Sequence, residues 1–99
     1  MREKAVVLEA IAQALGAARG REIAVADLPT TVHALDLKDE DAEHFVQCVS
    51  ESFALHALAE EELAAILRTE SLRSLTDFND MSIDQFADRI AVLPEWVAQ

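Results

Sequence analysis

Apolar residues that recur with the period of an α-helix are the feature of this 99-residue chain that most constrains its fold. The clearest apolar stripe lies within residues 40–53. Its members are Ala42, Phe45, Val46, Val49 and Phe53. They follow the spacing i, i+3, i+4, i+7 and i+11, which places them on one face of a helix. Because such a face must be buried against other elements, the chain is expected to form a bundle of amphipathic helices.

Three further segments carry helical signals. Residues 3–18 have an apolar face that predicts a first helix, and residues 59–68 predict a shorter third helix. The last helix is expected to begin after Ser82, because Gln85 stands where a capping box places its second member. A short helical turn is expected near residues 71–78.

The connection between the first two helices is long and covers residues 22–37. It carries spaced apolar residues that are expected to pin it to the bundle: Ile23, Val25, Leu28, Val32, Leu35 and Leu37. Residues 23–25 also fit a short strand, but no other segment of the chain could pair with it. The sequence therefore predicts one all-α domain over residues 1–99, with three longer helices, one or two short helices and a long first connection.

The charge of the chain restricts its partners. Lys and Arg number 8 and Asp and Glu number 19, which gives a net charge of −11. Such a charge repels nucleic acid and anionic membrane surfaces and favours a protein partner with a basic surface. It could equally serve solubility alone. A single cysteine, with no signal peptide and no apolar run long enough to span a membrane, predicts a cytoplasmic location.

The start of the second helix carries a family resemblance. Residues 35–41 read Leu-Asp-Leu-Lys-Asp-Glu-Asp, and the following helix ends in an acidic stretch and Phe53. This segment resembles the attachment motif of acyl carrier proteins, which reads Leu-Gly-Leu-Asp-Ser-Leu-Asp before an amphipathic acidic helix. Residues 81–90 are similar to the family's closing pattern Thr-Val-x-Asp-Leu-x-x-x-Ile. The resemblance covers about residues 5–93 and implies the carrier bundle, with a second helix that meets basic patches on partner enzymes.

Three consecutive departures from the family bear on the chemistry of the motif. Lys38 stands where carriers have Asp, Asp39 where they have the attachment serine, and Glu40 where they have Leu. A carboxylate cannot accept phosphopantetheine as a stable phosphodiester, and Glu40 removes an apolar residue that partner enzymes grip. The resemblance thus implies the shape and the acidic helix, with no cofactor. An Asp at the start of a helix is also a good N-cap, so Asp39 is expected to cap the second helix.

The candidate partner-binding residues are the carboxylates at and near the start of the second helix and one close to its end. They are Asp39, Glu40, Asp41, Glu43 and Glu51. The resemblance implies that they dock on a basic surface, for example of an acyl-chain enzyme, and the protein could compete with true carriers or regulate an acyl-transfer or secretion-linked machine. A plain solvated helix face explains the same residues equally well.

Two other functions remain open. A small acidic inhibitor or immunity-type protein, which blocks a basic nucleic-acid-binding partner, shares this size, helicity and charge. The absence of Tyr and the single Trp leave few of the aromatic anchors common at tight interfaces. The protein could also be a genuine carrier with an unrecognised attachment site. Residues 70–72, Glu-Ser-Leu, resemble Asp-Ser-Leu, but too few residues follow Ser71 to build the rest of the fold.

The sequence gives little support for a metal-binding or catalytic function. His33, His44 and His56 lack the HExxH spacing and have no CxxC partner. His44 and Cys48 lie one helical turn apart and could provide two ligands, but two ligands do not make a zinc site. Glu40, one turn before His44, only hints at a third. There is no nucleophile elbow and no Gly-rich phosphate loop, so neither a metal nor an enzymatic activity is expected.

Overall fold

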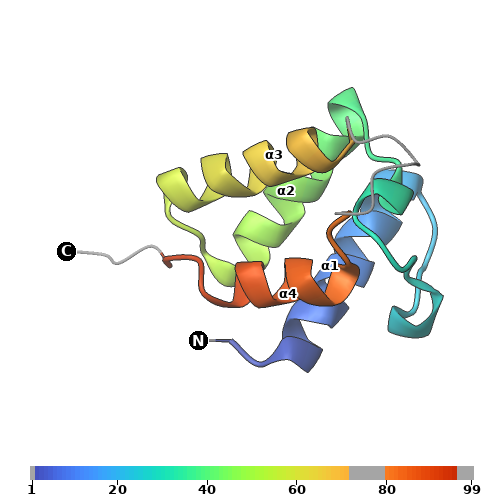
Figure 1. The fold of residues 1–99 in the computed structure, drawn as a ribbon, viewed down its shortest axis with the longest axis horizontal. Coiled ribbons are helices and arrows are strands. Elements are labelled where there is room, and N and C mark those ends of the chain that lie inside the picture. Colours follow the sequence, from blue (N-terminus) through green and yellow to red (C-terminus); the bar gives the residue numbers. More distant parts are fainter. Residues whose placement is uncertain (1, 72–79, 96–99) are drawn as a thin grey trace.

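The computed structural model describes residues 2–71 and 80–95, and these form a small all-α bundle (Figure 1). Four α-helices follow one another in this part of the chain. They are α1 (Lys4–Arg19), α2 (Asp39–Phe53), α3 (Ala57–Ser71) and α4 (Ile83–Ala91). The described residues contain no β-strand, and only two isolated bridges occur, between Thr31 and Ser82 and between Leu55 and Glu95. The all-α prediction is confirmed.

Helix α3 is longer than the sequence predicted. It spans Ala57–Ser71 in place of residues 59–68, because the flanking residues are mostly good helix formers that extend it at both ends. Among the four described α-helices, α4 is the shortest, with 9 residues. The turn expected near residues 71–78 lies outside the described residues, apart from Ser71 at the end of α3.

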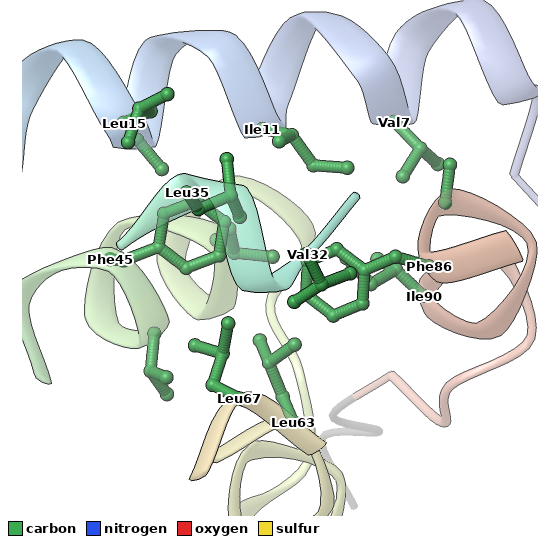
Figure 2. Close-up of a cluster of buried hydrophobic side chains, with 14 of the residues drawn as sticks. Val7, Ile11, Leu15, Val32, Leu35, Phe45, Leu63, Leu67, Phe86 and Ile90 are labelled. Atoms are coloured by element: carbon green, nitrogen blue, oxygen red, sulfur yellow. The ribbon is translucent and has the colours of Figure 1, made fainter. Parts of the chain in front are cut away.

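The core lies where the apolar faces of the four helices converge (Figure 2). Phe45 of α2 and Phe86 of α4 are fully buried, and their ring centroids lie 6.2 Å apart. Helix α1 covers them with Val7, Ile11 and Leu15. The opposite side is closed by α3 through its buried leucines, Leu63 and Leu67. Each helix therefore buries most of the apolar face that its sequence period predicted.

The long connection is pinned to the bundle, as predicted. It contains two 3₁₀ turns, at Val25–Asp27 and His33–Leu35. Val32, Leu35 and Leu37 are buried, and Ile23 and Leu28 pack partly against the core. Val25 was also expected to be an anchor, but this prediction is wrong: its side chain is exposed, because it lies on the first 3₁₀ turn, which buries no residue.

Backbone hydrogen bonds join the connection to the entry of α4. The Val32 amide donates to the Met81 carbonyl at 2.9 Å, and the Ile83 amide donates to the Thr30 carbonyl at 2.9 Å. The predicted capping box of α4 is confirmed, since the amide of Gln85 donates to Ser82 Oγ at 3.0 Å and the Ser82 amide donates to Gln85 Oε1 at 3.0 Å. The entry to α4 is thus fixed both locally and by the connection.

Candidate functional site: the acidic surface of α2 and its groove with α3

The start of α2 is built differently from the sequence prediction. The cap position belongs to Lys38, whose backbone is extended and whose side chain makes no capping hydrogen bond. Asp39 is the first residue of the helix and has a positive φ of 50°. The prediction that Asp39 caps α2 is therefore wrong, because a capping residue needs the extended backbone that Lys38 has taken.

A second residue with a left-handed backbone precedes the start of α2. Asp36 has φ 51° and ψ 44° and ends the second 3₁₀ turn. It stands at the position where the carrier motif has Gly, the residue for which a left-handed backbone costs least. Asp tolerates this conformation better than most other residues. The backbone here thus has the shape that a Gly in the motif would favour.

Arg19, at the end of α1, holds this turn in place. Its guanidinium group donates hydrogen bonds to the backbone carbonyls of Leu35 and Asp36, the second at 2.8 Å. It also forms an ion pair with Asp41 of α2 at 3.5 Å. Arg19 lies in the last turn of α1, where its charge also complements the dipole of its own helix. Its contacts with residues far along the chain could not be read from local spacing.

The five predicted partner-binding carboxylates are not equivalent. Asp41 points toward α1 and is half-buried in its ion pair with Arg19. The other four, Asp39, Glu40, Glu43 and Glu51, are exposed. Glu51 accepts a hydrogen bond from Gln47 at 3.2 Å. Within the described part of the chain, no cationic side chain lies within ion-pair distance of these four carboxylates. The acidic surface of α2 therefore consists of these four residues without Asp41.

Helices α2 and α3 lie against each other in the bundle (Figure 1). Between them is an open groove of about 820 Å³, called here the α2–α3 groove. Its lining residues are Leu37, Lys38, Asp39, Ala42, Glu43, Val46, Ala57, Glu60, Glu61, Ala64, Leu67 and Arg68. A second hollow of about 510 Å³ shares Glu43 and Glu60 with the groove and extends to Glu51. The groove therefore unites part of the acidic surface of α2 with acidic residues of α3.

Glu60 and Glu61 belong to this site but were not among the predicted site residues. The sequence placed them at the opening of a third helix and gave no indication that they would face α2. Their contribution depends on how α3 is rotated about its axis against α2, which its apolar residues Ala59, Leu63 and Leu67 fix by packing into the core. The only local signal was the run of three glutamates at residues 60–62.

The three histidines lie in separate settings. The Nδ1 atom of His33 lies 3.2 Å from the carbonyl oxygen of Glu70, and the Nδ1 atom of His56 accepts a hydrogen bond from the Leu58 amide at 3.1 Å. His44 is exposed on α2. Over residues 2–71 and 80–95, no three His, Cys, Asp or Glu side chains are grouped closely enough to hold a metal ion.

Cys48 is half-buried on α2, beyond the turn that carries His44. Burial raises the pKa of its thiol, and the negative charge of Glu51 raises this pKa further. A thiol in this setting is less often ionised than a free one and is a poorer nucleophile and metal ligand near neutral pH. The site therefore offers a binding surface made of carboxylates and apolar groups.

None of the described helices has both the length and the apolar character needed to cross a bilayer. No protein-family model, curated protein or solved structure gives a significant match to this chain. The resemblance to acyl carrier proteins accordingly rests on the residues of the chain itself.

Proposed function

We propose that this protein is an interaction module of the acyl-carrier type that carries no phosphopantetheine arm and docks on a basic surface of a partner protein, such as an acyl-chain enzyme. The observation that carries the proposal is the acidic surface of α2. Glu40, Glu43 and Glu51 are exposed, and no cationic side chain among the described residues neutralises them. Such a surface attracts a basic partner and accelerates their encounter.

Several cations elsewhere in the molecule form ion pairs with carboxylates outside the acidic surface of α2. Lys4 of α1 lies 3.6 Å from Asp84 and 3.7 Å from Asp88 of α4. Arg89 of α4 lies 3.0 Å from Glu62 of α3. The negative charge that remains without a close cation is thus concentrated in part on α2, the helix that the carrier resemblance assigns to partner recognition.

The left-handed backbone at Asp36 supports the carrier frame, because it coincides with the Gly of the attachment motif. Within that frame the exposed Asp39 occupies the place of the attachment serine. The carboxylate there cannot form the phosphodiester, which supports a module that binds without carrying an acyl group.

The test of docking is affinity capture from the native cells at low and high salt, with partners identified by mass spectrometry. We expect an acyltransferase, ketosynthase or other acyl-chain enzyme that is lost at high salt, because salt screens exposed charges over about 10 Å. The variant Glu40→Gln/Glu43→Gln/Glu51→Gln should lose this partner. The matched control Glu9→Gln/Glu22→Gln/Asp27→Asn, which removes as much charge from α1 and the first connection, should retain it.

Capture of a nuclease or another nucleic-acid-binding protein by the same acidic surface would contradict the carrier proposal and would support the acidic inhibitor. Equal capture by the wild type and the α2 variant would contradict docking through α2 altogether. Circular dichroism of both variants shows whether each remains folded.

The proposed absence of a phosphopantetheine arm is tested separately. A phosphopantetheinyl transferase and coenzyme A should leave the wild-type protein unmodified but should add one phosphopantetheinyl group to Asp39→Ser, detected by intact mass. A folded Asp39→Ser that stays unmodified would count against the carrier frame. Wild-type protein that already carries the group when isolated from its cells would identify a genuine carrier, and Ser71→Ala would then show whether Ser71 is the attachment site.

A further inference from the structure

We infer that the α2–α3 groove binds a cationic amphipathic helix of the partner, with the apolar stripe of that helix on the groove floor and its Lys and Arg side chains against both rims. This inference rests on the proposed function and specifies the element of the partner that the acidic surface recognises. It follows from the shape of the groove, from the chemistry of its floor and from the charge of its rims.

The floor of the groove is apolar. Val46, Leu37 and Leu67 form its base, and each is 4–7% exposed. Ala42 and Ala64 contribute small, half-buried side chains from α2 and α3 respectively. Because these side chains are short, the two helices leave a hollow between them that larger residues would fill. An apolar stripe of a partner helix could therefore bury its side chains here.

Both rims of the groove carry carboxylates, and Lys38 and Arg68 also line it, so its lining has a net negative charge. Asp39 and Glu43 come from α2, and Glu60 and Glu61 come from α3. Considering residues 2–71 and 80–95, none of the four has a cationic side chain within ion-pair distance. An apolar floor between rims of net negative charge is complementary to a helix whose apolar stripe is flanked by Lys and Arg on each side.

The charge and the apolar floor of the groove disfavour other kinds of ligand. A fatty acid or an acidic peptide would bring further negative charge into a lining where four carboxylates outnumber the cations Lys38 and Arg68, which Coulomb repulsion disfavours. A partner of basic but purely polar character would leave the apolar floor exposed. A cationic amphipathic helix satisfies both parts of the site.

The length of the groove sets the length of the helix. Together with the adjoining hollow, the lining residues of α2 run from Asp39 to Glu51. At 1.5 Å per residue this stretch is roughly 18 Å long and would accommodate about three turns of a partner helix. A synthetic peptide of about 18 residues is therefore long enough to fill the site and to form a helix when bound.

The test uses fluorescence anisotropy with a labelled Leu/Lys peptide whose leucines follow the spacing i, i+3, i+4 and i+7. Its controls are a peptide of the same composition with scrambled order and a Leu/Glu peptide. We expect saturable binding of the amphipathic Leu/Lys peptide alone. The variant Glu43→Gln/Glu60→Gln/Glu61→Gln should weaken it about tenfold, because it removes three of the four rim carboxylates. The control Glu9→Gln/Glu22→Gln/Asp27→Asn should stay within about twofold of the wild type.

A second variant tests the floor. Ala64→Arg places a long side chain in the groove from a half-buried position, so the helix should fold normally while the peptide is excluded. Amide chemical shifts of the wild-type protein should change on peptide addition at residues 42–46 and 57–68. Shift changes confined to another surface, or equal binding of the scrambled peptide, would overturn the inference. Laurate that binds more tightly than the Leu/Lys peptide would also overturn it and would assign the groove to an acyl chain.

The failure of this inference can be distinguished from failure of the proposed function. If Ala64→Arg still captures the cellular partner that the α2 charge variant loses, docking through α2 stands and the helix in the groove is excluded. If Ala64→Arg and the α2 charge variant both lose the partner, both proposals are supported. Thermal unfolding of Ala64→Arg verifies that the loss is not caused by misfolding.

Discussion

The guanidinium carbon of Arg2 lies 4.8 Å from the centre of the Phe53 ring, so the beginning of the chain is fixed to the end of α2. The same guanidinium group donates hydrogen bonds to the carbonyls of Ile90 at 2.9 Å and Leu93 at 3.0 Å, at the end of α4. It also forms an ion pair with Glu95 at 3.2 Å. A single side chain thus joins the N-terminal segment to the ends of two helices.

Replacement of Arg2 by Ala should destabilise the fold by about 2 kcal/mol, because it removes charge-assisted hydrogen bonds from a largely buried group together with a cation–π contact. The free energy of unfolding, measured in urea, checks this prediction. The matched control is Lys4→Ala, whose ion pairs with Asp84 and Asp88 are exposed and should contribute about 0.5 kcal/mol or less. Equal effects of the two substitutions would show that the Arg2 contacts contribute little.

Replacement of Ala54 by Gly should stabilise the protein by about 1 kcal/mol. Ala54 follows the last residue of α2 with φ 49°, a left-handed conformation that an L side chain disfavours and Gly adopts readily. Ala65→Gly, on an exposed position inside α3, should instead destabilise by about 1 kcal/mol. If thermal unfolding showed the same sign for both substitutions, the left-handed cap would not be a source of strain.

Replacement of Gly16 by Ala should destabilise the protein even though Ala favours helices over Gly by about 1 kcal/mol. A Cβ at Gly16 would lie 2.6 Å from the carbonyl oxygen of Arg21, so the backbone after α1 would have to move. The hydrogen bond from the Arg21 amide to the Gly16 carbonyl, at 3.0 Å, holds that backbone close. Gln13→Ala, on the exposed side of α1, should change stability by less than about 0.5 kcal/mol. A stabilised Gly16→Ala would disprove the close approach.

The thiol of Cys48 should react slowly with iodoacetamide near neutral pH. Burial, and then the charge of Glu51, raise its pKa, so less thiolate is present than in the unfolded chain. Glu51→Gln should speed alkylation at about pH 8, which lies near the ordinary pKa of a cysteine. The control Glu9→Gln should leave the rate unchanged. A rate that is identical in the folded protein and in urea would contradict the raised pKa.

The same shift predicts how stability depends on pH. Because the folded-state pKa of Cys48 is raised above the unfolded value, the folded state keeps the proton to higher pH. The stability linked to the protonated thiol is present below the unfolded pKa and is lost as the pH rises through the folded pKa. Wild-type protein should therefore lose more stability on alkaline titration than Cys48→Ala, as measured by urea unfolding. Parallel curves for the two proteins would refute this linkage.

Local features of the chain were predictable in detail. The capping box of Ser82 and Gln85 depends on residues only three positions apart, and the structure forms both of its hydrogen bonds. The apolar stripe of α2 buries Phe45, Val46 and Val49 as the helical period requires. The start of α2 was less predictable, because left-handed backbone at Asp36 and Asp39 has no firm local signature when Gly is absent.

The all-α class and the apolar face of each helix follow from the sequence alone, because helical period depends only on neighbouring residues. Which carboxylates lie close together depends on the tertiary structure. Packing turned Asp41 toward Arg19 of α1, and it brought Glu43 of α2 to the same groove as Glu60 and Glu61 of α3. Periodicity fixes the faces of a single helix, but the rotation and position of one helix against another follow from how their side chains fit in the shared core.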